Sequence, residues 1–322
     1  AKAAYRTFGS PSNPAILLPS CYGGKLESTL PFLYRSDAPN VASNSVVLPP
    51  ERYFIIVVGL LGGSESSSPS NTAAPFNGPN FPHTTYEDNM RLQRALCEHL
   101  GVSKLFGYIG FSMGGQQAYH MASLFPDFVD NSICIAGSAR TSWHNWSFLE
   151  GPKAALVNSV DFQDGNYSTK VVRGTGAFGR VYSTWALSQQ WFREKSWEKI
   201  GFATLQDYLR ENWEKRMGDW DAHDLLCLLR TWQMGDITIY HAEDNGDLAK
   251  ALARIKARML VMPSRTDTYF PPEDSMQEVK HLKAGKLSVI ESIWGHIAGG
   301  GGGTKEDCKF IENQVKEFLE DP

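Results

Sequence analysis

Short apolar runs bounded by turn-forming residues recur along the chain and alternate with stretches of helical periodicity. The apolar runs span residues 15–18, 53–60, 105–109, 132–136, 259–262 and 287–290. Runs that are apolar almost without a break are typical of strands buried on both faces, as in a parallel sheet. The pattern therefore predicts an α/β fold, with a mostly parallel sheet covered by helices on both faces.

The periodic stretches between these runs predict the helices. Thr84 and Glu87 have the spacing of a capping box, and Gly101 stands where a helix commonly ends in a left-handed residue. Further helices are predicted up to about Phe125 and over residues 305–319. The composition of residues 64–82 predicts a long surface loop, and the glycine run 299–303 predicts a flexible one.

The character of the chain changes between residues 140 and 253. This segment shows no buried strand, is amphipathic at helical spacing, and holds eight of the nine tryptophans. We expect a helical cap at 140–253, inserted into a core domain made of 1–139 and 254–322. The tryptophans are expected to form the interior of the cap or, less commonly for such residues, to line an aromatic pocket.

Composition narrows the possible partners. The 31 basic and 35 acidic residues leave a formal charge of −4 without a basic cluster, so neither nucleic acid nor an anionic membrane is a favoured partner. Five dispersed cysteines favour a reducing compartment and argue against zinc. No apolar run reaches the ~18 residues of a membrane span, and the first twenty residues do not read as a signal peptide, so we expect a cytoplasmic protein.

The strongest chemical signal is Gly110-x-Ser112-x-Gly114. This spacing is typical of a nucleophile elbow, in which a serine is held on a strained turn between a strand and a helix. The motif alone is weak, since glycine-rich turns also produce it. Here a buried strand precedes it and a helix follows, so we predict that Ser112 is a nucleophile.

A serine nucleophile needs a base and an acid that orients the base. His296 and Asp267 follow the last two predicted strands, and the carboxyl ends of parallel strands meet at one edge of a sheet. We predict a Ser112–His296–Asp267 triad, with Glu273 and Asp274 as competing acids. The other histidines are expected to be surface or packing residues: His83, His99, His120, His144, His223, His241 and His281.

Acyl transfer also requires backbone N–H groups that stabilise an oxyanion. Met113, which follows the nucleophile, is expected to supply one. The loop after the first strand is expected to supply the other, from Cys21 or Tyr22. Nothing near Cys21 in sequence would lower its pKa enough to make it a nucleophile. Arg230 is either a substrate anchor or, more commonly for arginine, solvated or ion-paired.

These residues make the sequence similar to the homoserine O-acetyltransferase family of the α/β-hydrolase superfamily. The resemblance rests on the run of residues 110–118, on 267–271, and on Gly295-His296. It implies the same triad, acetyl-CoA or another acyl-CoA as co-substrate without a bound cofactor, a helical lid over a deep tunnel, and a homodimer formed through that lid.

Two departures from the family separate this chain from enzymes that acetylate homoserine. Ile297 stands where the family carries an aspartate, which resembles an anchor for the substrate's amino group, and Phe111 replaces a glycine. An apolar residue cannot balance an ammonium group. We therefore expect a divergent member, with Phe111, Arg230, Trp294 and Ile297 as candidate pocket residues.

The sequence predicts an enzyme that works through an acyl-Ser112 intermediate and hydrolyses an ester or thioester of a small molecule. An alternative is a CoA-dependent O-acyltransferase that acts on a small alcohol. A second alternative is a non-catalytic ligand-binding protein with the hydrolase fold, and a third is lyase or cyclase chemistry with His296 as a base.

Overall fold

A seven-stranded sheet forms the centre of the protein. The computed structural model describes residues 1–38 and 46–321, and its strands lie in the order β1-β3-β2-β4-β5-β6-β7. Their bounds are β1 Tyr5–Phe8, β2 Ala15–Pro19, β3 Phe54–Val58, β4 Leu105–Phe111, β5 Val129–Ile135, β6 Arg258–Met262 and β7 Gly285–Leu287. β1 is antiparallel to β3, and the other neighbouring strands are parallel. This confirms the predicted α/β fold.

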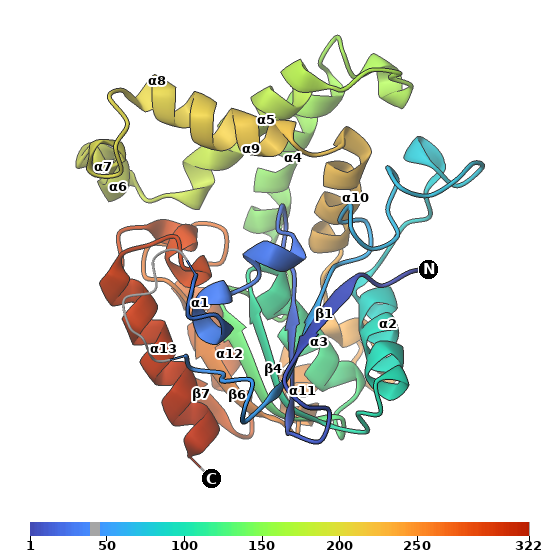
Figure 1. The fold of residues 1–322 in the computed structure, drawn as a ribbon, viewed down its shortest axis with the longest axis vertical. Coiled ribbons are helices and arrows are strands. Elements are labelled where there is room, and N and C mark those ends of the chain that lie inside the picture. Colours follow the sequence, from blue (N-terminus) through green and yellow to red (C-terminus); the bar gives the residue numbers. More distant parts are fainter. Residues whose placement is uncertain (39–45, 322) are drawn as a thin grey trace.

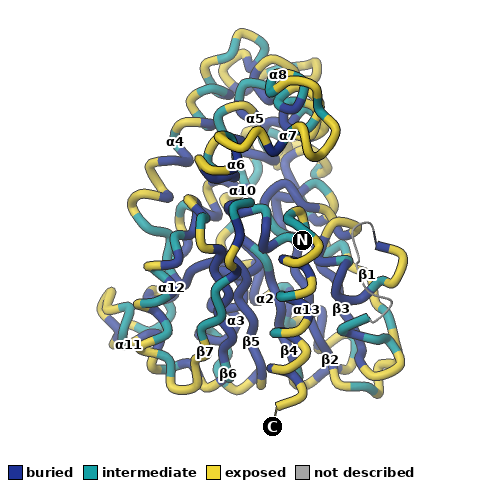
Figure 2. The backbone as a smooth tube through the Cα atoms, turned by 90° about the vertical axis from the view of Figure 1, so that its left-hand side faces the viewer, coloured by how far each residue is buried: buried dark blue, intermediate teal, exposed yellow. Residues whose placement is uncertain are grey.

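Helices cover both faces of the sheet (Figure 1). The layers contain α1 Pro31–Tyr34, α2 Tyr86–His99, α3 Met113–Leu124, α11 Leu248–Arg254, α12 Pro272–Val279 and α13 Lys305–Glu320. Leu17 of β2 joins the apolar cluster that contains α2 and α3 residues, whereas its neighbour Ile16 joins the cluster that contains α1 and α13 residues. Because side chains alternate between faces along a strand and both faces are covered, the central strands β2, β3 and β4 carry no charged residue and are almost entirely apolar. Figure 2 shows these strands as buried.

Two predicted element boundaries are wrong by a few residues. The capping box of α2 is formed by Thr85 and Asp88 instead of Thr84 and Glu87, because the Thr84 hydroxyl is engaged with Thr231 of the cap at 3.1 Å. β7 ends where the predicted strand 287–290 begins, and the chain then continues to a single β-bridge between Ile290 and Ser264. β1 is mostly exposed and has no unbroken apolar run, so no strand is predicted there from the sequence.

The cap lies above the edge of the sheet formed by the carboxyl ends of its parallel strands (Figure 1). It comprises α4 Trp143–Val157, α5 Val172–Ala186, α6 Gln189–Arg193, α7 Ser196–Lys199, α8 Leu205–Tyr208, a π-helical turn at Leu209–Glu214, α9 Lys215–Gly218 and α10 Ala222–Gln233. Trp191, Trp213 and Trp232 are buried in its aromatic cluster. Aromatic side chains therefore form a large part of the interior of the cap, together with aliphatic ones. Within the described residues, no helix is long and apolar enough to cross a membrane.

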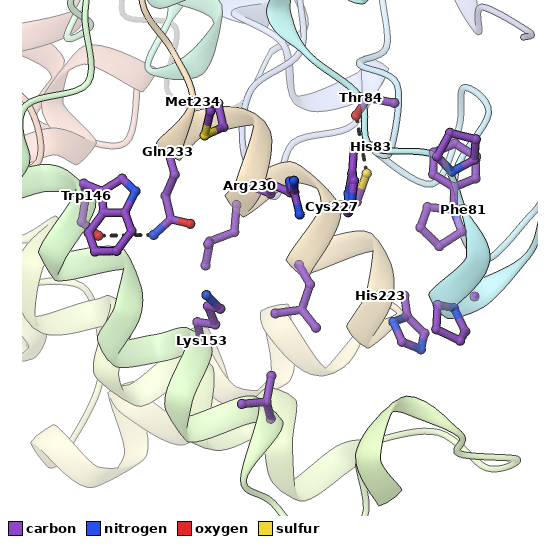
Figure 3. Close-up of a pocket in the computed structure, with 17 residues that line it drawn as sticks. Phe81, His83, Thr84, Trp146, Lys153, His223, Cys227, Arg230, Gln233 and Met234 are labelled. Carbon is purple, nitrogen blue, oxygen red and sulfur yellow. Dashed lines mark hydrogen bonds between the residues drawn. The ribbon is translucent and has the colours of Figure 1, made fainter.

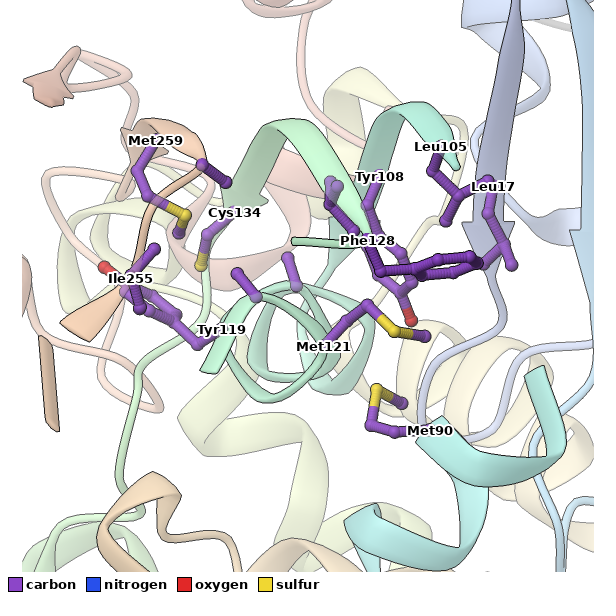
Figure 4. Close-up of a cluster of buried hydrophobic side chains, with 14 of the residues drawn as sticks. Leu17, Met90, Leu105, Tyr108, Tyr119, Met121, Phe128, Cys134, Ile255 and Met259 are labelled. Atoms are coloured by element: carbon purple, nitrogen blue, oxygen red, sulfur yellow. The ribbon is translucent and has the colours of Figure 1, made fainter. Parts of the chain in front are cut away.

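The cap ends earlier than the sequence suggested. Ile237, Ala251 and Leu252 are buried in the cluster of the sheet domain together with Met121 of α3. Figure 4 shows Ile255, at the end of α11, beside side chains of this cluster. Residues 237–255 thus pack with the core domain, although they were assigned to the cap up to residue 253. Their short amphipathic helix resembles those of the cap in sequence, so only the packing separates them.

Candidate active site

Ser112 lies on the sharp turn between β4 and α3, with φ of 59° and ψ of −124°. Non-glycine residues rarely adopt this conformation, which stores strain. The turn is closed so tightly that a Cβ atom on Gly110 would lie 2.0 Å from the Gly114 carbonyl oxygen, and one on Gly115 would lie 3.0 Å from Cys134 Sγ. The glycines are therefore required by close backbone approach, as the motif predicted.

Three side chains from three loops form one hydrogen-bonded chain. His296 Nε2 lies 2.8 Å from Ser112 Oγ, and His296 Nδ1 lies 2.7 Å from Asp267 Oδ2. The other carboxylate oxygen of Asp267 accepts hydrogen bonds from the backbone N–H groups of Tyr269 and Phe270, at 2.7 and 3.1 Å. This arrangement favours the tautomer in which Nδ1–H donates to the carboxylate and Nε2 accepts the serine proton.

Aromatic rings hold the imidazole in place. Phe111 stacks on His296 with ring centroids 4.7 Å apart, while Tyr269 and Phe270 pack against it at 4.8 and 5.6 Å. Phe111 is itself confined, because a Cβ atom on Gly300 would lie 2.6 Å from its ring. The glycine run 299–303, for which the sequence predicted a flexible loop, therefore begins in a tightly packed wall of the site. Gly300 is the last residue of a 3-10 turn that starts at Gly295.

The loop after β2 is fixed against the elbow. Ser20 N–H donates to the Val58 carbonyl at 2.8 Å, and Ser20 Oγ accepts from Leu60 N–H at 3.0 Å. The amide of Gln117 in α3 donates to the Ser20 carbonyl at 3.1 Å. The backbone that follows Ser20 is thus held next to the start of α3.

Three backbone N–H groups beside Ser112 are available for a developing negative charge. Met113 opens α3, where N–H groups have no partner inside the helix. Cys21 and Tyr22 line the same cavity as Ser112. Across residues 1–38 and 46–321, none of the three N–H groups donates a hydrogen bond. The structure brings both Cys21 and Tyr22 to the cavity that contains Ser112.

Cys21 is unsuited to be the nucleophile. Burial raises the pKa of its thiol to about 11, although the charge of Arg216 acts in the opposite direction. The thiol is therefore protonated at neutral pH, and the reactive thiolate is scarce.

A cavity of about 130 Å³ opens over Ser112. Its walls comprise Cys21, Tyr22, Gly24, Ser28, Phe111, Ser112, Tyr182, Ala186, Trp213, Arg216, Met217, Tyr269, His296, Ile297, Gly300 and Gly302. The predicted pocket residues Phe111 and Ile297 are among them. Sequence reasoning missed the cap residues Tyr182, Arg216 and Met217, because nothing in their spacing distinguishes them from other residues of an amphipathic helix.

Two candidate pocket residues lie elsewhere. Trp294 packs edge-on against Trp191 of the cap, with ring centroids 5.8 Å apart, instead of lining the cavity. Arg230 lines a separate cavity of about 360 Å³ together with Lys153 and Gln233, between α4, α10 and the loop 69–84 (Figure 3). Arg230 does not line the Ser112 cavity and is exposed, as the solvated alternative expected, because α10 turns its apolar side, including Trp232, toward the cap interior and leaves Arg230 on the opposite side.

The competing candidates do not reach the serine. Asp274 and Glu273 lie in the first turn of α12, and neither forms a hydrogen bond or ion pair with His296. In the part of the chain that the structure describes, none of the seven other histidines contacts Ser112 through a hydrogen bond. Over the same residues, no three His, Cys, Asp or Glu side chains gather into a metal site.

Known proteins are similar to this chain over most of its length. Residues 14–300 match the family model described as the alpha/beta hydrolase fold. The chain belongs to the alpha/beta hydrolase family. This α/β-hydrolase is 32% identical over 300 residues to the ethyl acetate hydrolase of Pseudomonas veronii, across 92% of this chain and 83% of the relative.

Other relatives of this α/β-hydrolase include both esterases and acyltransferases. The structure of the acetyl esterase MekB superposes with a TM-score of 0.91 at 30% identity, covering 99% of this chain and 91% of that one. The homoserine O-acetyltransferase of Symbiobacterium thermophilum is 28% identical over 352 residues, across 98% of this chain and 88% of the relative. The resemblance seen in the sequence is confirmed, and this member of the family is an enzyme.

Proposed function

We propose that this enzyme hydrolyses esters of short acyl groups with small alcohols through an acyl-Ser112 intermediate. The observation that carries the proposal is the continuous hydrogen-bonded chain from Ser112 Oγ through His296 to Asp267, at 2.8 and 2.7 Å. The relatives named ethyl acetate hydrolase and acetyl esterase support an ester as the substrate.

The geometry allows a complete acylation step. His296 Nε2 takes the proton of Ser112 as Oγ attacks the ester carbonyl carbon, and Asp267 stabilises the imidazolium that forms. The N–H of Met113 and that of Cys21 or Tyr22 would stabilise the oxyanion. The imidazolium then gives its proton to the departing alcohol. Water, activated by the same imidazole, attacks the acyl group, and the carboxylic acid leaves Ser112.

The cavity favours small neutral or anionic substrates. Its volume of about 130 Å³ is well below the roughly 300 Å³ at which drug-sized ligand sites begin. Among the described residues that line it, there is no aspartate or glutamate, and Ile297 is apolar. An ammonium group such as that of homoserine would be left without a counter-charge.

The similarity to a homoserine O-acetyltransferase supports a second candidate function, acyl transfer. In that reaction an alcohol instead of water accepts the acyl group. The two functions share every step up to the acyl-enzyme. They differ in whether water reaches the acyl group.

The test is intact-mass spectrometry of the protein mixed with p-nitrophenyl acetate and, separately, with acetyl-CoA. We expect one acetyl group on Ser112 from the ester and its rapid loss to water. Ser112→Ala should abolish the adduct and ester turnover, whereas Ser103→Ala, on an exposed loop, should retain both. An adduct from acetyl-CoA that persists until an alcohol is added would mean an acyltransferase. No adduct and no turnover would mean a ligand-binding protein.

A further inference from the structure

Arg216 is the one permanently charged side chain among the described residues that line the Ser112 cavity. It comes from α9 of the cap, between Lys215 and Met217, and Met217 is a buried wall residue. The rest of the lining is aromatic, apolar, hydroxyl-bearing or glycine, apart from His296 and Cys21. Arg216 is itself exposed, so its guanidinium is in contact with solvent and also forms part of the cavity wall.

This guanidinium has no carboxylate partner in the described structure. Neighbouring arginines are paired: Arg210 with Asp207 and Glu211, and Arg180 with Glu214. Arg216 forms no ion pair, and its hydrogen bond to the Gly23 carbonyl is long, at 3.5 Å. Four of its five N–H donors therefore have no partner among the described residues.

The charge of Arg216 is close enough to act on the groups around the nucleophile. Burial raises the pKa of the Cys21 thiol to about 11 and raises that of the Tyr182 hydroxyl still further, and in both cases Arg216 acts against the rise. Gly23, which accepts its hydrogen bond, follows directly after the loop that would supply the oxyanion N–H. A substrate bound at Ser112 would therefore lie within reach of the guanidinium.

We propose that Arg216 binds a carboxylate carried by the substrate, so that the preferred substrate is a short ester with one anionic group beside the scissile bond. Guanidinium groups hold carboxylates by paired N–H donors, and hydrogen bonds between charged groups are stronger than neutral ones. The inference rests on the proposed ester hydrolysis at Ser112 and names the substrate class of that site.

The test uses matched pairs of esters that differ in one charge. On the acyl side, p-nitrophenyl hemisuccinate is compared with p-nitrophenyl butyrate. On the alcohol side, the acetate ester of glycolate is compared with n-propyl acetate. In each pair the measured quantity is the ratio of kcat/KM for the anionic ester to kcat/KM for the neutral one. The pair with the higher ratio shows which side of the ester carries the recognised carboxylate.

We expect Arg216→Met, which keeps the aliphatic stem, to lower this ratio about ten- to hundredfold in one pair, mostly through KM. Arg216→Lys should retain part of the ratio, since it keeps the charge and loses the fork of donors. Arg210→Met is the matched control, because Arg210 is also exposed on the cap but already paired, and its ratio should equal that of the wild type. High salt should lower the wild-type ratio and leave that of Arg216→Met unchanged.

A ratio near one in both wild-type pairs, or the same ratio in Arg216→Met as in wild type, would overturn the proposal. Turnover of the neutral esters tests ester hydrolysis separately. If no ester is turned over, calorimetric titration of Ser112→Ala with succinate and with glycolate decides the matter. Binding of either anion that is lost in the Ser112→Ala/Arg216→Met double variant would support the anion site without the hydrolysis. The absence of any binding would reject both.

Discussion

Two cavities that are lined partly by cap residues differ in volume and in the groups that line them. The cavity of Figure 3 measures about 360 Å³, whereas that over Ser112 measures about 130 Å³. The larger one is lined by the basic residues Lys153 and Arg230 and by Gln233, whose side-chain amide donates a hydrogen bond to Glu150 at 2.7 Å. It has no strained nucleophile. The smaller one holds a serine at positive φ, a fixed imidazole and free N–H groups.

The comparison shows that the candidate active site is distinguished by polar groups that converge on Ser112, and not by the volume of its cavity. A large cavity needs only an imperfect fit between the cap and the sheet domain. A small cavity with a strained backbone and a buried, hydrogen-bonded carboxylate persists only where the surrounding structure holds it in place. Three changes test this contrast.

The largest effect is expected from Asp267→Asn. An asparagine keeps the size of the side chain but can hold the imidazole in the wrong tautomer, so we expect kcat for p-nitrophenyl acetate to fall about 10³- to 10⁴-fold. Asp274→Asn is the matched control, because Asp274 lies in the first turn of α12 and forms no hydrogen bond or ion pair with His296. Steady-state kinetics of both variants provide the measurement. A fall of less than tenfold for Asp267→Asn would remove Asp267 from the proposed mechanism.

A smaller effect is expected from Gly300→Ala. The added methyl group would lie 2.6 Å from the Phe111 ring and press it toward His296, so we expect kcat/KM to fall about tenfold to hundredfold through misplacement of the base. Gly218→Ala adds a methyl group with no neighbour within 4 Å and serves as the control. Shortening the ring side chain in the double variant Gly300→Ala/Phe111→Leu should recover part of the loss. Unchanged kinetics in Gly300→Ala would show that the tight wall is not needed.

The smallest effect on catalysis is expected from a carboxylate beside the larger cavity. Asp224 of α10 accepts hydrogen bonds from the backbone N–H and hydroxyl of Ser70, at 3.0 and 2.6 Å, and so ties the loop 64–82 to the cap. Burial raises its pKa from 3.8 to about 6, although the bonds from Ser70 act against the rise. Because the folded protein holds this proton more tightly than the unfolded chain, its contribution to stability is present below pH 3.8 and is lost as the pH rises through 6.

Asp224→Asn should remove this part of the pH dependence, which amounts to about 2 kcal/mol of unfolding free energy between pH 4 and pH 7. Urea denaturation at both pH values measures it, with Asp127→Asn, an exposed carboxylate, as the control. We expect kcat to stay within about twofold of wild type in Asp224→Asn. A loss of activity as large as that of Gly300→Ala would show that the two cavities are coupled through α10.

Much of the site could be predicted because its reacting groups follow strands. Ser112, Asp267 and His296 each come after an apolar run, and parallel strands bring their carboxyl ends to one edge whatever the length of chain between them. Part of the elbow is also local, since Gly110 is required by the close approach of Gly114, four residues along the chain. The three predicted residues lie together even where an element boundary is wrong by a residue, as for the α2 capping box, which begins at Thr85 instead of Thr84.

The cap shows where such reasoning stops. Helical periodicity separates an apolar side from a polar side, but Arg216 and Arg230 both lie on polar sides of cap helices. One lines the Ser112 cavity and the other lines the cavity of Figure 3. Residues 237–255 have the same kind of pattern and pack with the sheet domain instead.

The sequence by itself determined the fold class, the chain order of Ser112, Asp267 and His296, and the strained turn that carries Ser112, because each depends on local spacing or on strand order. The tertiary structure decided the size of the cavity, the aromatic support of His296 and the position of Arg216 in the cavity wall. Those features depend on how the aromatic interior of the cap, including Trp191 and Trp213, sets its helices over the sheet. That packing joins residues far apart in the chain, and no local pattern encodes it.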